Sequence, residues 1–162
     1  MRVLIFEPDH AGHHFLHLGL LIPPLKALGV EVVVATTEVA RSTKPYQVYL
    51  SPLESAATID AWMSPLPPTT VANARQKLRD FRESINRAKP DWVCIPYADG
   101  LAQLLGVARC MGVRALPRDL EAAGLMMRGL FAYPHTGVKQ RLWARASWEA
   151  VKRAPLSQVF IL

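Results

Sequence analysis

Short apolar runs alternate with longer segments of helical periodicity along most of the chain. Runs rich in β-branched and aromatic residues predict strands at residues 3–6, 31–35, 46–50, 92–95, 113–116 and 157–162. Apolar residues at steps of three and four predict helices at residues 15–28, 71–88, 101–111, 120–127 and 135–153. Thr36 and Thr37 are expected to begin a short helix towards Arg41. The proline-rich residues 51–70 are expected to form a long loop.

This alternation of strands and helices predicts one α/β domain over residues 1–162. We expect a single Rossmann-like, doubly wound and mostly parallel sheet of about six strands, with helices on both faces. The order 3-2-1-4-5-6 is assumed, which makes strands one and four neighbours and places the ligand edge at their carboxyl ends. Pro23 and Pro24 are expected to kink the first helix or begin a second one, and Gly29 is expected to end it.

The charge and cysteine content of the chain limit the kinds of partner and cellular compartment that we expect. The chain has 19 Lys and Arg against 13 Asp and Glu, a net charge of +6, which suits an anionic ligand or surface. The basic residues are scattered and no nucleic-acid motif is present, so we expect no nucleic-acid partner. Cys94 and Cys110 lack ligand-like spacing and are expected to be buried, reduced thiols of a cytoplasmic protein. No apolar run approaches the roughly 18 residues of a membrane span.

A histidine-rich turn follows the first strand, at the edge where such a sheet does its chemistry. In the assumed order, the turn that holds His13 lies beside the turn that precedes Asp99. A histidine can take a proton from a hydroxyl, while a carboxylate fixes its tautomer and stabilises the imidazolium. Gly12 would let an acceptor approach the backbone. The alternative is that Asp99 only caps a helix and that the histidines cover the sheet edge.

The sequence of the histidine-rich turn gives little support for a cofactor site or a metal site. No G-x-G-x-x-G and no G-x-x-x-x-G-K-[ST] motif is present, so we predict no bound dinucleotide cofactor. On one continuous helix, four histidines would share a face and could bind zinc: His10, His13, His14 and His17. However, His10 is expected to precede the helix, and no H-E-x-x-H motif occurs. We therefore predict no metal site.

Three stretches resemble the opening of the GT-B glycosyltransferases: Ala11-Gly12-His13-His14, Leu25-Lys26-Ala27-Leu28-Gly29 and Val30-Glu31-Val32-Val33-Val34-Ala35-Thr36. In that family a GH turn leads into a helix, and an LG(H/V)EV motif leads into the second strand. The resemblance extends more loosely through residues 91–100. It implies that the chain is an amino-terminal, acceptor-side domain.

The resemblance implies an enzyme that moves a sugar from a nucleotide-sugar donor to an acceptor hydroxyl. In branches that use a histidine base, the histidine of the GH turn matches His13 and its aspartate partner matches Asp99. Several other branches use different residues at the second position. Gly12, His14 and Gly100 are then expected to contact the acceptor.

A GT-B enzyme also has a carboxyl-terminal, donor-binding domain, which residues 1–162 are expected to lack. The chain is then a fragment, or its donor half is a separate subunit, and these residues alone should be inactive. The competing hypothesis is a non-catalytic α/β module that binds an anionic small molecule or a partner protein. A further alternative is peripheral membrane contact through the basic helix at residues 135–153. We expect instead that its Trp143 and Trp148 pack on the sheet while the charges face water.

Overall fold

The computed structural model describes residues 1–10, 13–67, 70–126 and 137–161. Within them lies one parallel sheet whose strand order, β3-β2-β1-β4-β5-β6, confirms the assumed order. The strands are β1 (Arg2–Phe6), β2 (Glu31–Thr37), β3 (Thr58–Met63), β4 (Trp92–Ile95), β5 (Glu121–Met126) and β6 (Gln158–Ile161). The chain is therefore an open, doubly wound α/β domain of the predicted class.

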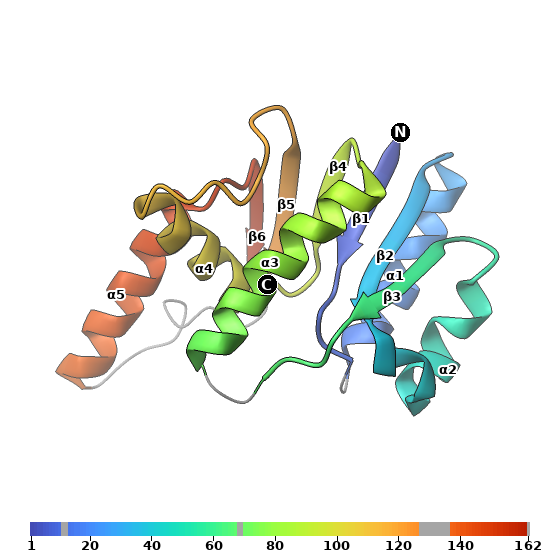
Figure 1. Ribbon diagram of the computed structural model, residues 1–162, viewed down its shortest axis with the longest axis horizontal. Helices are drawn as coiled ribbons and strands as arrows, with labels where there is room; N and C mark the ends of the chain where they lie inside the picture. Colours follow the sequence, from blue (N-terminus) through green and yellow to red (C-terminus); the bar gives the residue numbers. More distant parts are fainter. Residues whose placement is uncertain (11–12, 68–69, 127–136, 162) are drawn as a thin grey trace.

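Helices cover both faces of this sheet, as predicted (Figure 1). They are α1 (His14–Ala27), α2 (Lys44–Tyr49), α3 (Thr70–Ala88), α4 (Ala98–Cys110) and α5 (Val138–Arg153), with 3-10 turns at Glu38–Ser42 and Ser51–Leu53. Alternate residues of β1 point to opposite faces, so that Ile5 packs towards α1 and α2 while Phe6 packs towards α3 and α4. Phe6 meets Phe81 of α3 edge to face, with ring centroids 5.1 Å apart.

The expected third strand at residues 46–50 is wrong, because that segment forms α2. Thr43 caps the helix by accepting a hydrogen bond from the Tyr46 backbone N–H at 3.3 Å, and Pro45 suits its first turn. Tyr46 is buried because this short helix lies against α1. The true third strand, β3, lies inside the expected loop at residues 51–70 and forms an edge of the sheet.

The expected strand at residues 113–116 and the expected helix at residues 120–127 are also wrong. Residues 113–116 form no strand, while Glu121–Met126 form β5 between β4 and β6. The sequence EAAGLM favours a helix by propensity, but pairing on both sides outweighs that preference. Gly124 fits here because a Cβ atom on it would lie 2.8 Å from the Cβ of Ala98. Close packing of β5 against α4 therefore decides this segment.

The first helix continues through Pro23 and Pro24 to Ala27, so the expected second helix does not form. Gly29, with φ +73°, follows its end as expected. Of the two cysteines, Cys110 is exposed, which corrects the expectation that both are buried. Burial raises the pKa of the half-buried Cys94 thiol to about 11. No helix within the described ranges is both long and apolar enough to cross a bilayer.

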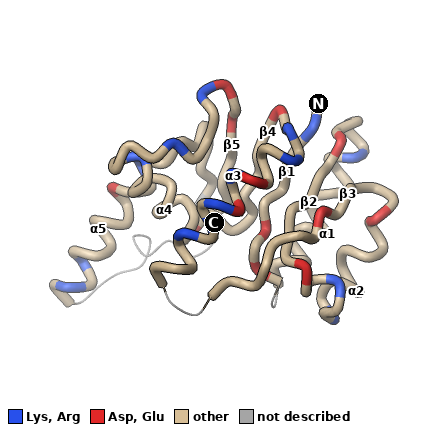
Figure 2. The backbone as a smooth tube through the Cα atoms, viewed as in Figure 1, with Lys and Arg blue, Asp and Glu red and all other residues tan. Residues whose placement is uncertain are grey.

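Helix α5 lies at one end of the long axis of the molecule, beside α4 (Figure 1). The expectation that Trp143 and Trp148 pack on the sheet is wrong for Trp143, which is 64% exposed, and Trp148 is 37% exposed. The reason is that α5 buries only small or short side chains: Ala144, Ser147 and Val151. Figure 2 shows basic but no acidic positions along the first half of this helix.

Candidate functional site

Aromatic and imidazole rings gather where β1 and β4 end, the edge predicted for the site. Tyr97, just before α4, is stacked on His14 with ring centroids 3.9 Å apart. The rings of His13 and His17 lie 5.3 Å and 5.4 Å from the same tyrosine ring. The structure thus brings the turn after β1 against the turn after β4, although they are far apart in sequence. This confirms the predicted neighbourhood of the two turns.

Glu7 is the buried carboxylate of this cluster and is only 1% exposed. Its backbone N–H donates to the Ala35 carbonyl at 3.0 Å, which extends β1 along β2. Oε1 of Glu7 accepts from the Asp9 backbone N–H at 3.0 Å and lies 3.1 Å from Nδ1 of His14. Burial raises the pKa of Glu7, while the hydrogen bond with His14 opposes that rise.

His14 is held on both ring nitrogens. Besides Glu7 on Nδ1, the Oδ2 atom of Asp9 lies 3.8 Å from its Nε2. Burial lowers the pKa of His14, but the hydrogen bond and charge of Glu7, with the charge of Asp9, outweigh it, so that the pKa is raised. The imidazole therefore stays protonated to higher pH than usual, in a fixed orientation against Tyr97.

Sequence reasoning missed Glu7 and its contact with His14, and considered only Asp99, as the partner of His13. The available signal was a carboxylate placed directly after the buried run Val3–Phe6, at the edge to which the histidines belong. That position forces the side chain to be either solvated beyond the sheet or buried with a partner. Here it is buried, and His14 is the partner.

The other predicted site residues lie around this cluster. His13 immediately precedes α1 and is exposed, with the His14 and His17 rings 5.5 Å and 5.8 Å away. Asp99 lies in the first turn of α4 and is not its N-cap, a position held by Tyr97. Gly100 follows Asp99 and is exposed, with open space where a Cβ would be. Gly12 lies outside the described residues, and the pairing of His13 with Asp99 stays a prediction.

His10 does not lie on the same helix face as the other histidines, which the zinc site considered above would require. It precedes α1, as expected, and its Nδ1 lies 3.1 Å from Oγ1 of Thr37 at the end of β2. Within the part of the chain that the structure describes, no three His, Cys, Asp or Glu side chains converge as a metal site would require. The Thr37 contact instead ties the histidine turn to the neighbouring strand.

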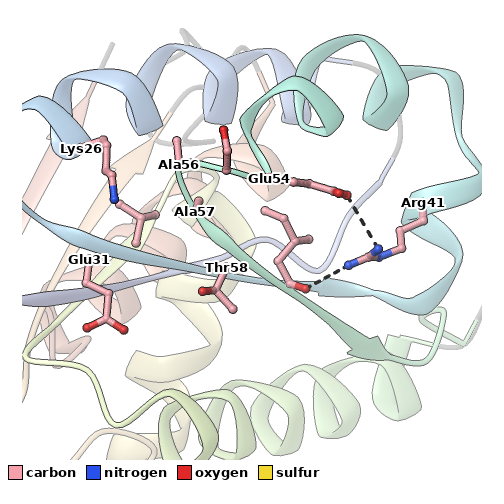
Figure 3. Close-up of a pocket in the computed structure, with 10 residues that line it drawn as sticks. Lys26, Glu31, Arg41, Glu54, Ala56, Ala57 and Thr58 are labelled. Carbon is pink, nitrogen blue, oxygen red and sulfur yellow. Dashed lines mark hydrogen bonds and ion pairs between the residues drawn. The ribbon is translucent and has the colours of Figure 1, made fainter.

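A separate hollow of about 440 Å³ lies at the amino ends of β2 and β3, away from the histidines (Figure 3). Arg41 points across it towards Glu54, at 3.7 Å, and donates to the Ile59 carbonyl at 3.4 Å. Glu54 also accepts a hydrogen bond from the Tyr46 hydroxyl. These charges are thus matched within the protein, and the histidine edge remains the candidate site.

Comparisons with known proteins support the fold. No protein-family model matches the chain, and no curated protein sequence does. Among solved structures, MurG of Acinetobacter baumannii is similar with a TM-score of 0.50 and 12% identity, over 99% of this chain and 40% of MurG. UGT2 of Phytolacca americana, complexed with UDP-2fluoro-glucose and pterostilbene, is similar with a TM-score of 0.56 and 14% identity, over 99% of this chain and 46% of UGT2. The chain therefore spans less than half the length of either protein, and its fold is that of one domain of GT-B glycosyltransferases.

Proposed function

We propose that the chain is the acceptor-side half of a glycosyltransferase, which moves a sugar from a nucleotide-sugar donor to an acceptor hydroxyl. The observation that carries this proposal is the cluster of His13, His14, His17 and Tyr97 at the carboxyl ends of β1 and β4. The strand order reverses between these two strands, which is where open α/β sheets bind ligands. A fold shared with two glycosyltransferases supports the same assignment.

His13 is the proposed general base. It is exposed at the start of α1, so an acceptor hydroxyl can reach its ring. The base removes the hydroxyl proton while the oxygen bonds to the anomeric carbon, and the bond from that carbon to the phosphate oxygen breaks. The nucleotide leaves as its diphosphate. Asp99, in the neighbouring first turn of α4, is the proposed partner that orients the base and stabilises its charge.

His14 is the other candidate base, because it carries a buried carboxylate partner. Its Nδ1 faces Glu7, its Nε2 faces Asp9, and its ring is stacked on Tyr97. A ring held on both nitrogens is a poor acceptor for a substrate proton, so we assign His14 to positioning the turn and contacting the acceptor. Gly12 and Gly100 complete the proposed acceptor contacts.

The donor half is the proposed partner. The chain spans 40% of MurG and 46% of UGT2, so a donor-binding domain comparable to the rest of those proteins is needed for transfer. We propose that it is supplied by further residues or by a separate subunit, and that the reaction takes place in the cytoplasm. Residues 1–162 alone should hold the acceptor side of the site and little activity.

The test is transfer by the chain expressed together with the reading frames that adjoin its coding sequence. Release of nucleoside diphosphate from sugar nucleotides is measured against a panel of hydroxyl acceptors. His13→Ala and Asp99→Ala should each lower the rate about 100-fold or more, as expected for loss of a base or its partner. Asp119→Ala, at an exposed position between α4 and β5, is the matched control and should keep full activity.

Normal transfer by folded His13→Ala and Asp99→Ala proteins would contradict the assignment of the base. If His13→Ala alone keeps its activity and His14→Ala loses it, the base is His14. If no assembly transfers a sugar, while the chain binds an anionic small molecule independently of His13, the alternative of a non-catalytic module holds.

A further inference from the structure

Helix α5 presents large apolar side chains to solvent. Its buried face is made by Ala144, Ser147 and Val151, which are small enough for α5 to lie close against α4. Val138 is 66% exposed, and Leu142 and Trp143 are each 64% exposed. Val138 and Leu142 are four positions apart and share one side of the helix, and Trp143 lies on the adjoining side, four positions after Lys139.

The exposed residues form one continuous surface. Val138, Lys139, Leu142, Trp143 and Ala146 line a shallow hollow of about 570 Å³ on the outside of α5. The helix lies at the end of the molecule, beyond α4, so a broad flat surface can approach it without contacting the opposite end of the sheet (Figure 1). We call these five residues the α5 patch.

Lys139 belongs to the α5 patch, two further basic residues lie beside it, and the acidic residue of the helix is already paired. Lys139, Arg141 and Arg145 are exposed in the same two turns and form no ion pair with the described part of the chain. Glu149, the one acidic residue of α5, lies a turn further on and bonds Lys152 at 2.6 Å and Arg153 at 3.1 Å. The first half of the helix is therefore apolar and cationic without opposing charge (Figure 2).

We propose that the α5 patch docks the protein on an anionic phospholipid surface. Trp143, Leu142 and Val138 enter the boundary between headgroups and acyl chains, while the surrounding cations contact lipid phosphates. The stems of Lys and Arg can lie along the apolar residues with their charges outward. A lipid monolayer offers apolar depth and anionic phosphates together at every point, which matches this pattern more closely than a protein surface of fixed charges. The inference does not depend on the proposed transferase activity.

Co-sedimentation of the full chain with vesicles tests the proposal. Vesicles of phosphatidylcholine with phosphatidylglycerol should bind the chain, vesicles of phosphatidylcholine alone should bind it at least about tenfold less, and salt should weaken binding. The double variant Leu142→Ser with Trp143→Ser, and the variant Arg141→Gln with Arg145→Gln, should each lose about tenfold in affinity or more. Circular dichroism establishes that each variant is folded.

The matched control carries Leu20→Ser in α1 and Leu28→Ser at the carboxyl cap of that helix; the two leucines are 66% and 79% exposed. It removes two exposed apolar side chains away from α5 and should bind vesicles like the parent chain. No binding by the parent, equal binding to both vesicle types, or equal loss in the control overturns the proposal. The proposal is also overturned if a donor half covers Trp143 and the resulting complex does not bind vesicles. The α5 patch would then be an interface between domains.

Discussion

Helices α1 and α5 lie on opposite halves of the same sheet and differ in the size of the side chains that they bury. Helix α1 buries large residues against α2 and the strands: Phe15, Leu18 and Ile22. Helix α5 buries small ones and leaves Leu142 and Trp143 in solvent. On the α1 side, polar groups at the helix start gather into a cluster around the buried Glu7. On the α5 side, cations surround exposed apolar residues.

The difference shows that hydrophobic pattern alone does not say where a helix packs. Helix α1 buries a large apolar residue at each contact with the sheet, although it also leaves Leu20 66% exposed. Helix α5 approaches α4 so closely that a Cβ on Gly106 of α4 would lie 1.7 Å from the carbonyl oxygen of Ala150. Close helix contact leaves no room for tryptophan, so the large residues of α5 lie outside. The α1 half of the domain therefore holds the candidate site, and the α5 half presents the exposed α5 patch.

The largest expected difference in stability is between alanine variants of two aromatic residues, one in α1 and one in α5. Phe15→Ala should lower the free energy of unfolding by about 3–5 kcal/mol, because Phe15 is fully buried edge-on against Tyr46 and a cavity would remain. Trp143→Ala should change it by no more than about 0.5 kcal/mol, because most of that side chain is in solvent. Guanidinium denaturation followed by circular dichroism measures both values. Equal losses would mean that Trp143 is a core residue, and the comparison would fail.

A smaller effect is expected from a methyl group added at each helix contact. Gly106→Ala should destabilise the fold by about 2–3 kcal/mol, because the backbone of Ala150 cannot give way to the new Cβ without moving α5. Gly19→Ala in α1 is the control, since its Cβ would lie 3.5 Å from the Tyr49 carbonyl oxygen, an ordinary contact. Because alanine favours a helix, Gly19→Ala should be neutral or stabilising by up to about 1 kcal/mol. Urea midpoints of the two variants check this, and a stable Gly106→Ala protein would refute the close contact of α4 with α5.

Much of the fold could be predicted where local pattern and tertiary environment agree. The runs that became β1, β2 and β4 are apolar, rich in β-branched and aromatic residues, and pack on both faces of the sheet, so a central strand suits them. The errors fall where the two conflict. Residues 46–50 carry a strand-like pattern but follow a capping threonine and a proline. Residues 121–126 carry a helical composition, but small side chains are what a central strand under α4 requires.

The location of the candidate site could be predicted from the sequence, but the contacts between its side chains could not. Parallel topology alone puts the turns after β1 and β4 together, so His13 and the start of α4 could be expected near one another. Which carboxylate meets which histidine depends on side-chain directions that spacing does not encode. Glu7 therefore went unnoticed, and the ring of Tyr97 at the centre of the histidines was not anticipated, because a lone tyrosine in a turn carries no motif.

The smallest expected effect concerns the pH dependence that the Glu7–His14 pair gives the α1 half. The raised pKa of His14 contributes stability that is full below the unfolded histidine pKa and is lost as pH rises through the folded one. The raised pKa of buried Glu7 acts in the same direction, because the folded state holds that proton above the pH at which the unfolded state releases it. Between about pH 5 and pH 8, the parent chain should therefore lose stability on the order of 1 kcal/mol, since water partly screens His14, whose side chain is 17% exposed.

Glu7→Gln should flatten this slope, because the glutamine keeps the hydrogen bond from Asp9 but does not ionise. The His14 pKa, followed by NMR, should fall in that variant, although Asp9 still supports the charged imidazole and Lys77 opposes it. Glu38→Gln, at an exposed position, is the matched control and should keep the parent slope. An unchanged slope and an unchanged His14 pKa in Glu7→Gln would show that Glu7 does not hold the imidazole. The histidine cluster would then be a solvated edge, and the contrast between the two halves would rest on packing alone.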